Sequence, residues 1–210
     1  MSSWTWTFVK AKAIPKDIVN KICNKAIQQK SNIWFYKKAK EDFKKALNEW
    51  IDMHDKNYDY LINECGVSPN KMTHEYLEKE LNESIKDISE YINSLNLVKE
   101  GKLTLDKCLR KHKIWKEKGL GEPYCYYIKN TVWVKIPEIF RLQEYSDMGI
   151  ETGLKTIDSI IEYLSNPERK SRLTWWDNNN LKEGFSQELE TKLRKYYEQF
   201  GDMNFSVHFG

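Results

Sequence analysis

The amino-acid sequence predicts an α+β fold that is predominantly helical, in which a small antiparallel or mixed sheet joins both ends of the chain and a long αα-hairpin is inserted. Three runs of residues predict the sheet: 4–9, 124–136 and 205–209. Each alternates large apolar with polar side chains, which is typical of a strand with one buried face. Because the segments between these runs carry helical periodicity, we expect the first and last strands to meet in one sheet.

Pro15 begins the first predicted helix, which ends near Lys30, because proline fits the first helical turn, where its missing N–H would have no partner. Ser31 or Asn32 then caps a long helix over 33–65, and Gly66 provides its left-handed stop. Apolar residues recur every three or four positions along this helix and define its buried face: Phe35, Ala39, Phe43, Leu47, Trp50, His54, Tyr58, Leu61 and Cys65.

A second long helix is predicted over 68–95, beginning at Ser68 and Pro69. Its apolar residues also step by three or four positions, close to a coiled-coil seam: Leu77, Leu81, Ile85, Ile88, Ile92 and Leu95. Since the link around Gly66 is short, the two helices must run antiparallel. They form an αα-hairpin about 40 Å long at ~1.5 Å per residue.

A shorter helix over 104–118, capped by Thr104, follows the hairpin. A β-hairpin that turns at Lys129 and Asn130 comes next, and Pro137 separates it from a further strand over 139–145. The sequence therefore returns to strands after its long helical stretch.

The remaining segments predict a helix over 153–165, a loop at 178–180 and a last helix from Ser186 to Gly201. Without residues 31–120, the order of elements is that of a small α+β layer fold. We therefore predict a single α+β domain over 1–210 that carries a helical arm at 31–120.

The composition favours a folded protein of the bacterial cytoplasm. Eight Trp and twelve Tyr can anchor a core, whereas disordered chains are poor in aromatic residues. No segment approaches the ~20 apolar residues of a membrane span, and we find no signal peptide. Cys23, Cys65 and Cys108 fall on apolar helix stripes, where we expect them to act as small hydrophobic residues.

Charge is strongly segregated, although the net charge is only +3. The net charge is +8 over residues 1–45, −7 over 46–100, +5 over 101–120 and −3 over 121–210. Such blocks either pair within one fold or face different partners.

Two segments imitate metal sites without completing them. The run from His74 to Glu78 begins like a zinc-protease helix, but Glu78 stands where that motif needs a second histidine. The run from Asp55 imitates a calcium loop, but Tyr60 replaces its essential glycine. We also find no nucleophile elbow and no glycine-rich phosphate loop. We therefore assign no metal, cofactor or catalytic residue.

Two charged surfaces are the candidate binding sites. The acidic one lies along the helical arm, where carboxylates spaced along a rigid hairpin can mimic a phosphate strand toward a basic protein partner: Glu64, Glu75, Glu78, Glu80, Glu83, Asp87 and Glu90. The basic one is the helix over 107–118, whose cations suit phosphate groups, together with a cluster that precedes Trp175 and Trp176: Lys107, Arg110, Lys111, Lys118, Arg169, Lys170 and Arg172. The simpler alternative for both surfaces is a helix face that contacts only solvent.

Aromatic and apolar residues recur with a particular spacing in the C-terminal part of the chain: Ile139-Phe140-Arg141-Leu142-x-Glu144-Tyr145, Glu162-Tyr163-Leu164 and the terminal Phe205-x-Val207-x-Phe209-Gly210. This spacing, over roughly residues 124–210, resembles that of small uncharacterised proteins of phages and mobile elements in AT-rich Gram-positive bacteria. It implies a phage-borne factor and transfers no active site.

These observations together predict a non-enzymatic phage or mobile-element protein that binds a host or defence macromolecule, most simply a protein, in the manner of an inhibitor. A nucleic-acid-binding accessory protein using the basic 107–118 helix is the first alternative. An enzyme whose site is assembled only in space is the second.

Overall fold

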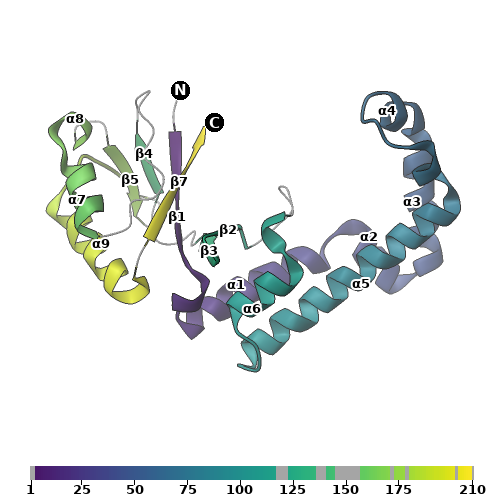
Figure 1. Cartoon of the computed structure of the whole chain (residues 1–210), viewed down its shortest axis with the longest axis horizontal. Helices are drawn as coiled ribbons and strands as arrows, with labels where there is room; N and C mark the ends of the chain where they lie inside the picture. The colour runs from purple at the N-terminus through teal and green to yellow at the C-terminus, as the bar shows by residue number, and fades with distance from the viewer. Residues whose placement is uncertain are drawn as a thin grey trace. The chain divides into compact units, whose positions relative to one another are not determined.

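The computed structural model describes residues 3–116, 123–135, 141–144, 157–170, 173–177, 180–201 and 203–209. It confirms a predominantly helical α+β fold (Figure 1). The chain divides into two compact units, one formed by Met1–Lys21 with Thr104–Gly210 and the other by Ile22–Leu103. We call them the sheet unit and the helical unit.

The two ends of the chain are paired in the sheet unit, as the sequence predicts. Strand β1 (Ser3–Lys10) runs antiparallel to β7 (Met203–Phe209), from Ser3 opposite Phe209 to Val9 opposite Met203. Figure 1 shows the purple first strand beside the yellow last one. The first and last strands therefore stabilise each other along almost their whole length.

Other strands extend the sheet from β1. Strands β3 (Thr131–Lys135) and β4 (Arg141–Glu144) pair with opposite ends of β1. Strand β2 (Cys125–Ile128) joins β3, while β5 (Leu173–Asp177) and β6 (Asn180–Glu183) continue from β4. Every pairing among the described strands is antiparallel.

The β2–β3 turn agrees with the prediction, whereas the β5–β6 hairpin was not predicted. Lys129 and Asn130 both have positive φ, 47° and 59°, as a two-residue type I′ turn requires. The expected loop at 178–180 is wrong at Asn180, where β6 begins. Three of its four residues are polar and three of its side chains are exposed, so β6 has no alternating pattern to reveal it.

The sheet unit also contains α6 (Leu105–His112), α7 (Ile157–Ser165), α8 (Pro167–Lys170) and α9 (Gln187–Phe200), with short 3₁₀ turns η1 (Ala11–Ala13) and η3 (Ile114–Lys116). Ser186 caps α9 by accepting a hydrogen bond from Leu189 N, and Gly201 ends it with φ 70°, as predicted. Residues 153–156 of the predicted 153–165 helix, and Pro137, lie outside the described residues.

Helix α6 is shorter than the predicted 104–118 helix. Thr104 caps it as expected, but Lys113 adopts a left-handed conformation with φ 51° and ends it. Leu105, Cys108 and Leu109 are buried, and the helix packs on β3, where Val132 and Val134 are also fully buried. This packing fixes α6 on the β2–β3 hairpin.

The helical unit contains most of α1 (Lys16–Ser31), followed by α2 (Trp34–Glu41), α3 (Phe43–Lys56), α4 (Tyr58–Asn63), η2 (Pro69–Met72) and α5 (His74–Lys99). The predicted single helix over 33–65 is wrong, because the chain breaks at Asp42 and Asn57. Asp42 is extended, with φ −154° and ψ 101°, and its side chain accepts from Lys45 N. The carboxylate thus starts a new helix instead of continuing the old one.

The second arm helix begins later than predicted. Thr73, rather than Ser68, caps α5 by accepting from Tyr76 N, and residues from Pro69 form a 3₁₀ turn. Of the predicted seam, Leu77, Leu81 and Leu95 are fully buried, and the three isoleucines between them are half-buried. Both α2 and α3 pack against α5.

The bounds of the inserted unit also differ from the expected arm at 31–120. The boundary falls inside α1, between Lys21 and Ile22, and Cys23 and Ala26, which follow it, are fully buried. At its other end, α6 belongs to the sheet unit, since its apolar face covers β3.

Cysteine reactivity follows from this packing. Cys23 is fully buried, and burial raises the pKa of its thiol to about 11, although Lys99 opposes the shift. Cys65 is exposed beyond the end of α4, so its expected place on a buried stripe is wrong, whereas Cys108 is buried as expected.

We expect Cys65 to react rapidly with a thiol reagent such as Ellman's reagent at pH 8, and Cys23 to react only after unfolding. Only the thiolate is nucleophilic, and a raised pKa together with burial leaves Cys23 protonated and covered. Mass spectrometry of the labelled peptides, with and without guanidinium chloride, measures both rates. Labelling of Cys23 as fast as Cys65 in the native state would contradict the packing of α1.

Candidate nucleic-acid interface

Arg110 joins helix α6 to the β2–β3 turn. Its Nε donates to Asp106 Oδ2 at 2.8 Å, Nη1 donates to Tyr127 OH at 3.3 Å, and Nη2 donates to Asn130 O at 2.5 Å. The hydrogen bond to Asp106 is the main cause that raises the pKa of Arg110, so the guanidinium stays charged. Arg110 is therefore fixed in place and is not a freely moving cation.

A stack of planar groups lies beside this contact. The rings of Trp115 and Tyr127 are nearly parallel, at 18°, with centroids 4.9 Å apart. The guanidinium carbon of Arg110 lies 5.2 Å from the Tyr127 centroid. Tyr127 is 36% exposed and Trp115 is half-buried, so the column reaches the surface.

Five lysines lie on the same segments as the column. Those at 107 and 111 lie on the outer face of α6, those at 113 and 116 follow the helix, and Lys129 is in the β2–β3 turn; all five are exposed. Asp106 is the only carboxylate in residues 104–116 and 123–135, and Arg110 pairs with it. We call this surface the basic hairpin face: Lys107, Arg110, Lys111, Lys113, Trp115, Lys116, Tyr127 and Lys129.

Sequence reasoning found only part of this surface. It selected Lys107, Arg110 and Lys111, but it did not single out Trp115 or Tyr127. The sequence does not show the contact between these two rings because it depends on how the elements pack. Tyr127 lies opposite Val132, on the strand face that α6 covers. Lys118, the fourth predicted cation of this helix, lies outside the described residues.

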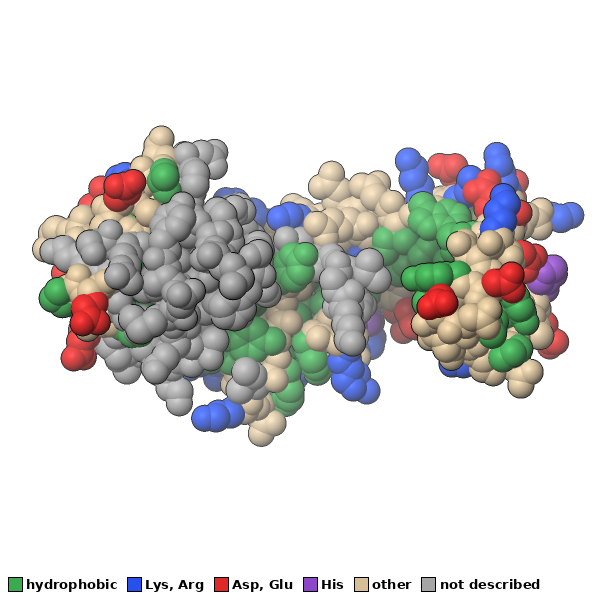
Figure 2. Space-filling view, turned by 90° about the horizontal axis from the view of Figure 1, so that it is seen from above, with side chains coloured by type: hydrophobic (Ala, Val, Ile, Leu, Met, Phe, Trp, Pro, Cys, Tyr) green, Lys and Arg blue, Asp and Glu red, His purple; other side chains and the backbone are tan. Residues whose placement is uncertain are grey.

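The predicted acidic residues do not form a field of one sign. All are exposed except Glu80, which is half-buried, and all but Glu64 lie on α5. Lys79 and Lys86 are exposed on the same helix, and Lys79 Nζ lies 4.0 Å from Glu83 Oε1. Figure 2 shows acidic and basic side chains intermingled at the end of the helical unit. This pattern is typical of a solvated helix with (i, i+4) pairs.

The structure does not describe the side chains of the second predicted basic cluster. Arg172 lies outside the described residues, and the side chains of Arg169 and Lys170 are likewise not described. Trp175, which follows them, is 1% exposed and has Lys182 and Lys192 over its ring, at 5.0 and 5.9 Å from the centroid. Trp175 is thus a core residue and offers no exposed face for a base.

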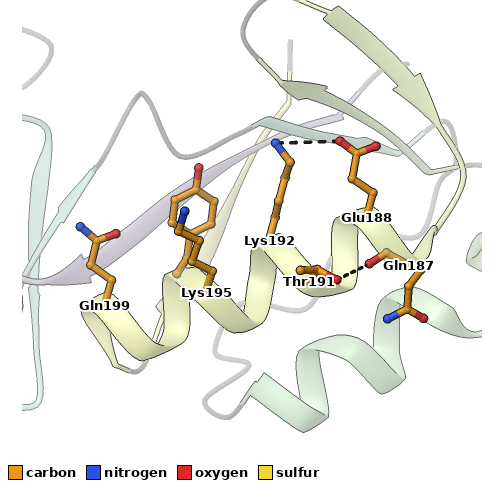
Figure 3. A pocket seen from close by; sticks show the side chains of 7 residues that line it. Gln187, Glu188, Thr191, Lys192, Lys195 and Gln199 are labelled. Atoms are coloured by element: carbon orange, nitrogen blue, oxygen red, sulfur yellow. Dashed lines mark hydrogen bonds and ion pairs between the residues drawn. The ribbon is translucent and has the colours of Figure 1, made fainter.

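A hollow of about 620 Å³ lies along α9, lined by residues that include Glu188, Lys192, Lys195 and Tyr196 (Figure 3). Glu188 is the only carboxylate among the described lining residues. It accepts from Lys182 Nζ at 2.5 Å and lies 4.0 Å from Lys192 Nζ. The Glu188 carboxylate, which could otherwise act as a general base, is therefore paired with two lysines. Among the described lining residues, no nucleophile has a base beside it.

His54 and His74 make local contacts within the helical unit. His54 Nδ1 lies 2.8 Å from Trp50 O, and His74 Nε2 lies 3.2 Å from Asp55 Oδ2 at the surface. His208 is in β7, and its side chain is not described. Within the described ranges, no three His, Cys, Asp or Glu side chains are grouped so that they could hold a metal ion.

Comparison with known proteins gives no match: no family model, no curated protein and no solved structure is similar to this chain. The resemblance to phage and mobile-element proteins therefore stays a prediction. Among the described helices, none is long and apolar enough to cross a membrane.

Proposed function

We propose that this protein binds nucleic acid through the basic hairpin face. The observation that carries the proposal is that five exposed lysines lie on the two segments that form the Arg110–Tyr127–Trp115 column, and that these segments hold a single carboxylate. Cations attract a phosphate backbone and release its counterions, and interleaved aromatic groups are typical of nucleic-acid interfaces.

Helix α6 and the β2–β3 turn together present these groups on a rigid support. Lys107 and Lys111 are one helical turn apart on the exposed face, and Arg110 ties the helix to the turn that carries Lys129. Such a support presents these lysines from an ordered backbone, so binding does not have to order a loop. The lysines can then contact phosphate groups, while Arg110 holds α6 against the β2–β3 turn.

A protein partner for the acidic face of α5 stays a prediction. Glu83, Asp87 and Glu90 recur at helical spacing, as mimicry of a phosphate strand requires, but Lys79 and Lys86 lie among them. Mixed charge weakens the long-range field that steers a basic partner. The charges of the basic hairpin face are more nearly of one sign than those of α5. We therefore propose the basic hairpin face as the binding surface.

We expect the double substitution Lys107→Glu and Lys111→Glu to weaken binding to a labelled 20-residue oligonucleotide by at least about tenfold at low salt, because it replaces two phosphate contacts with repulsion. Fluorescence anisotropy measures the dissociation constant. Both lysines are exposed, so the melting temperature should change little.

The matched control is Lys79→Glu with Lys86→Glu, which makes the same charge change on exposed lysines of α5. It should bind nearly as tightly as the unchanged protein. Equal weakening by both double variants would show that only net charge matters and would contradict the proposed surface. Absence of binding by the unchanged protein at 50 mM salt would reject the function itself.

A further inference from the structure

We infer that the nucleic acid bound by the basic hairpin face is single-stranded, with an unpaired base stacked on the Arg110–Tyr127–Trp115 column. The inference rests on the proposed function and adds the class of nucleic acid to it. It is carried by the geometry of the column and not by the charge around it.

The column consists of two stacked aromatic rings and a guanidinium group over one of them. Trp115 and Tyr127 are 18° from parallel with centroids 4.9 Å apart, and the Arg110 guanidinium lies 5.2 Å from the Tyr127 ring. Indole, phenol and guanidinium groups all stack on π-faces. A base can therefore extend the column as one more planar layer.

Hydrogen bonds hold the column in this arrangement. Arg110 donates to Asp106, Tyr127 and Asn130, and Tyr127 OH donates to Asn130 Oδ1 at 3.1 Å. The turn that carries Asn130 is itself fixed by two residues with positive φ. Because these groups are already ordered, stacking a base on them costs little side-chain entropy.

A flat aromatic surface distinguishes single strands from duplexes. The faces of bases in a duplex are already covered by their neighbours, whereas an unpaired base offers a π-face whatever its identity. Tyr127 is 36% exposed, and exposed Lys111 and Lys129 lie on the two elements that Arg110 joins. These lysines can contact the phosphate backbone of the bound strand.

Tyr124 provides a matched control on the same hairpin. It is 45% exposed, more than Tyr127, and the ammonium of Lys135 lies 4.7 Å from its ring centroid. Since side chains alternate along an extended chain, Tyr124 points to the face opposite that of Tyr127. A general preference for exposed tyrosine would involve both residues, whereas the column involves only Tyr127.

The experiment measures anisotropy of labelled oligo(dT), oligo(rU) and a mixed-sequence duplex of equal length, at one salt concentration. Single strands should bind at least about tenfold more tightly than the duplex. Tyr127→Leu should weaken single-strand binding by about fivefold to a hundredfold, the range for one lost base stack. Tyr127→Phe keeps the ring but loses the hydroxyl's hydrogen bonds, so it should weaken binding less than Tyr127→Leu does, whereas Tyr124→Leu should stay within about threefold of the unchanged protein. The oligo(dT) and oligo(rU) arms tell whether DNA or RNA is preferred.

A second readout does not depend on any variant. An oligonucleotide with 2-aminopurine at one position should lose fluorescence on binding the unchanged protein, because stacking quenches this base. Equal affinity for duplex and single strands, without quenching, would overturn the inference and leave the proposed function standing. Absence of binding to every oligonucleotide would reject both.

Discussion

Removal of residues 203–210 is expected to abolish cooperative unfolding of the sheet unit instead of shortening a tail. These residues contain β7, which pairs with β1 from Ser3 to Val9. Without β7, one whole edge of β1 loses its hydrogen-bonded neighbour, and short unsupported strands are unstable in water. Circular dichroism during heating measures the loss.

A synthetic peptide of residues 203–210 provides the control for this deletion. If the missing strand is the cause, the added peptide should restore a cooperative transition in a concentration-dependent way. A truncated chain that melts within a degree or two of the full chain would show that β7 contributes nothing to the fold.

The substitution Leu81→Ala is expected to lower the free energy of unfolding of the helical unit by about 2–5 kcal/mol, the usual cost of a cavity at a buried leucine. Leu81 is fully buried on the face of α5 that continues through Leu77 and Leu95. Ile88→Ala should cost less, because Ile88 is only half-buried. Urea denaturation followed by circular dichroism gives the values.

Leu97→Ala is the matched control, since Leu97 lies on the same helix and is 41% exposed. It should change the free energy of unfolding by less than about 1 kcal/mol. A loss below about 0.5 kcal/mol at Leu81 would mean that the predicted seam does not pack against α2 and α3.

Local signals predicted the elements that depend on local chemistry. Ser186 and Gly201 bound α9, Thr104 begins α6, and the two-residue turn lies at Lys129 and Asn130. Period-two patterns at both ends of the chain likewise predicted the pairing of β1 with β7. At the helix ends and at Asn130, a residue type suited to the local backbone conformation marks the position.

Breaks in a continuous apolar stripe were invisible to the same reasoning. Ala39 and Phe43 are four residues apart, so the stripe passes across Asp42 without a gap, although the Asp42 side chain caps a new helix there. Lys113 ends α6 in a left-handed conformation that lysine rarely adopts. Periodicity reports which face is buried and does not report where a helix is interrupted.

In the candidate interface too, the sequence predicted the charged residues but not the contacts between elements. A cluster of lysines is visible in the sequence, and three of its predicted members lie on α6. The column requires Trp115, Arg110 and Tyr127 to meet through the packing of α6 on β3. No spacing rule within one element relates these residues, so only the three-dimensional structure identifies the stack.

The salt dependence of oligonucleotide binding tests the basic hairpin face most directly. For a single strand, the logarithm of the association constant should fall with the logarithm of salt concentration with a slope of about −0.7 per phosphate contact. With several cations in contact we predict a slope steeper than about −2, reduced by about 1.4 in the Lys107→Glu, Lys111→Glu variant and unchanged in the Lys79→Glu, Lys86→Glu control. Binding that is insensitive to salt, or a slope that is equal in both variants, would contradict the assignment of this surface.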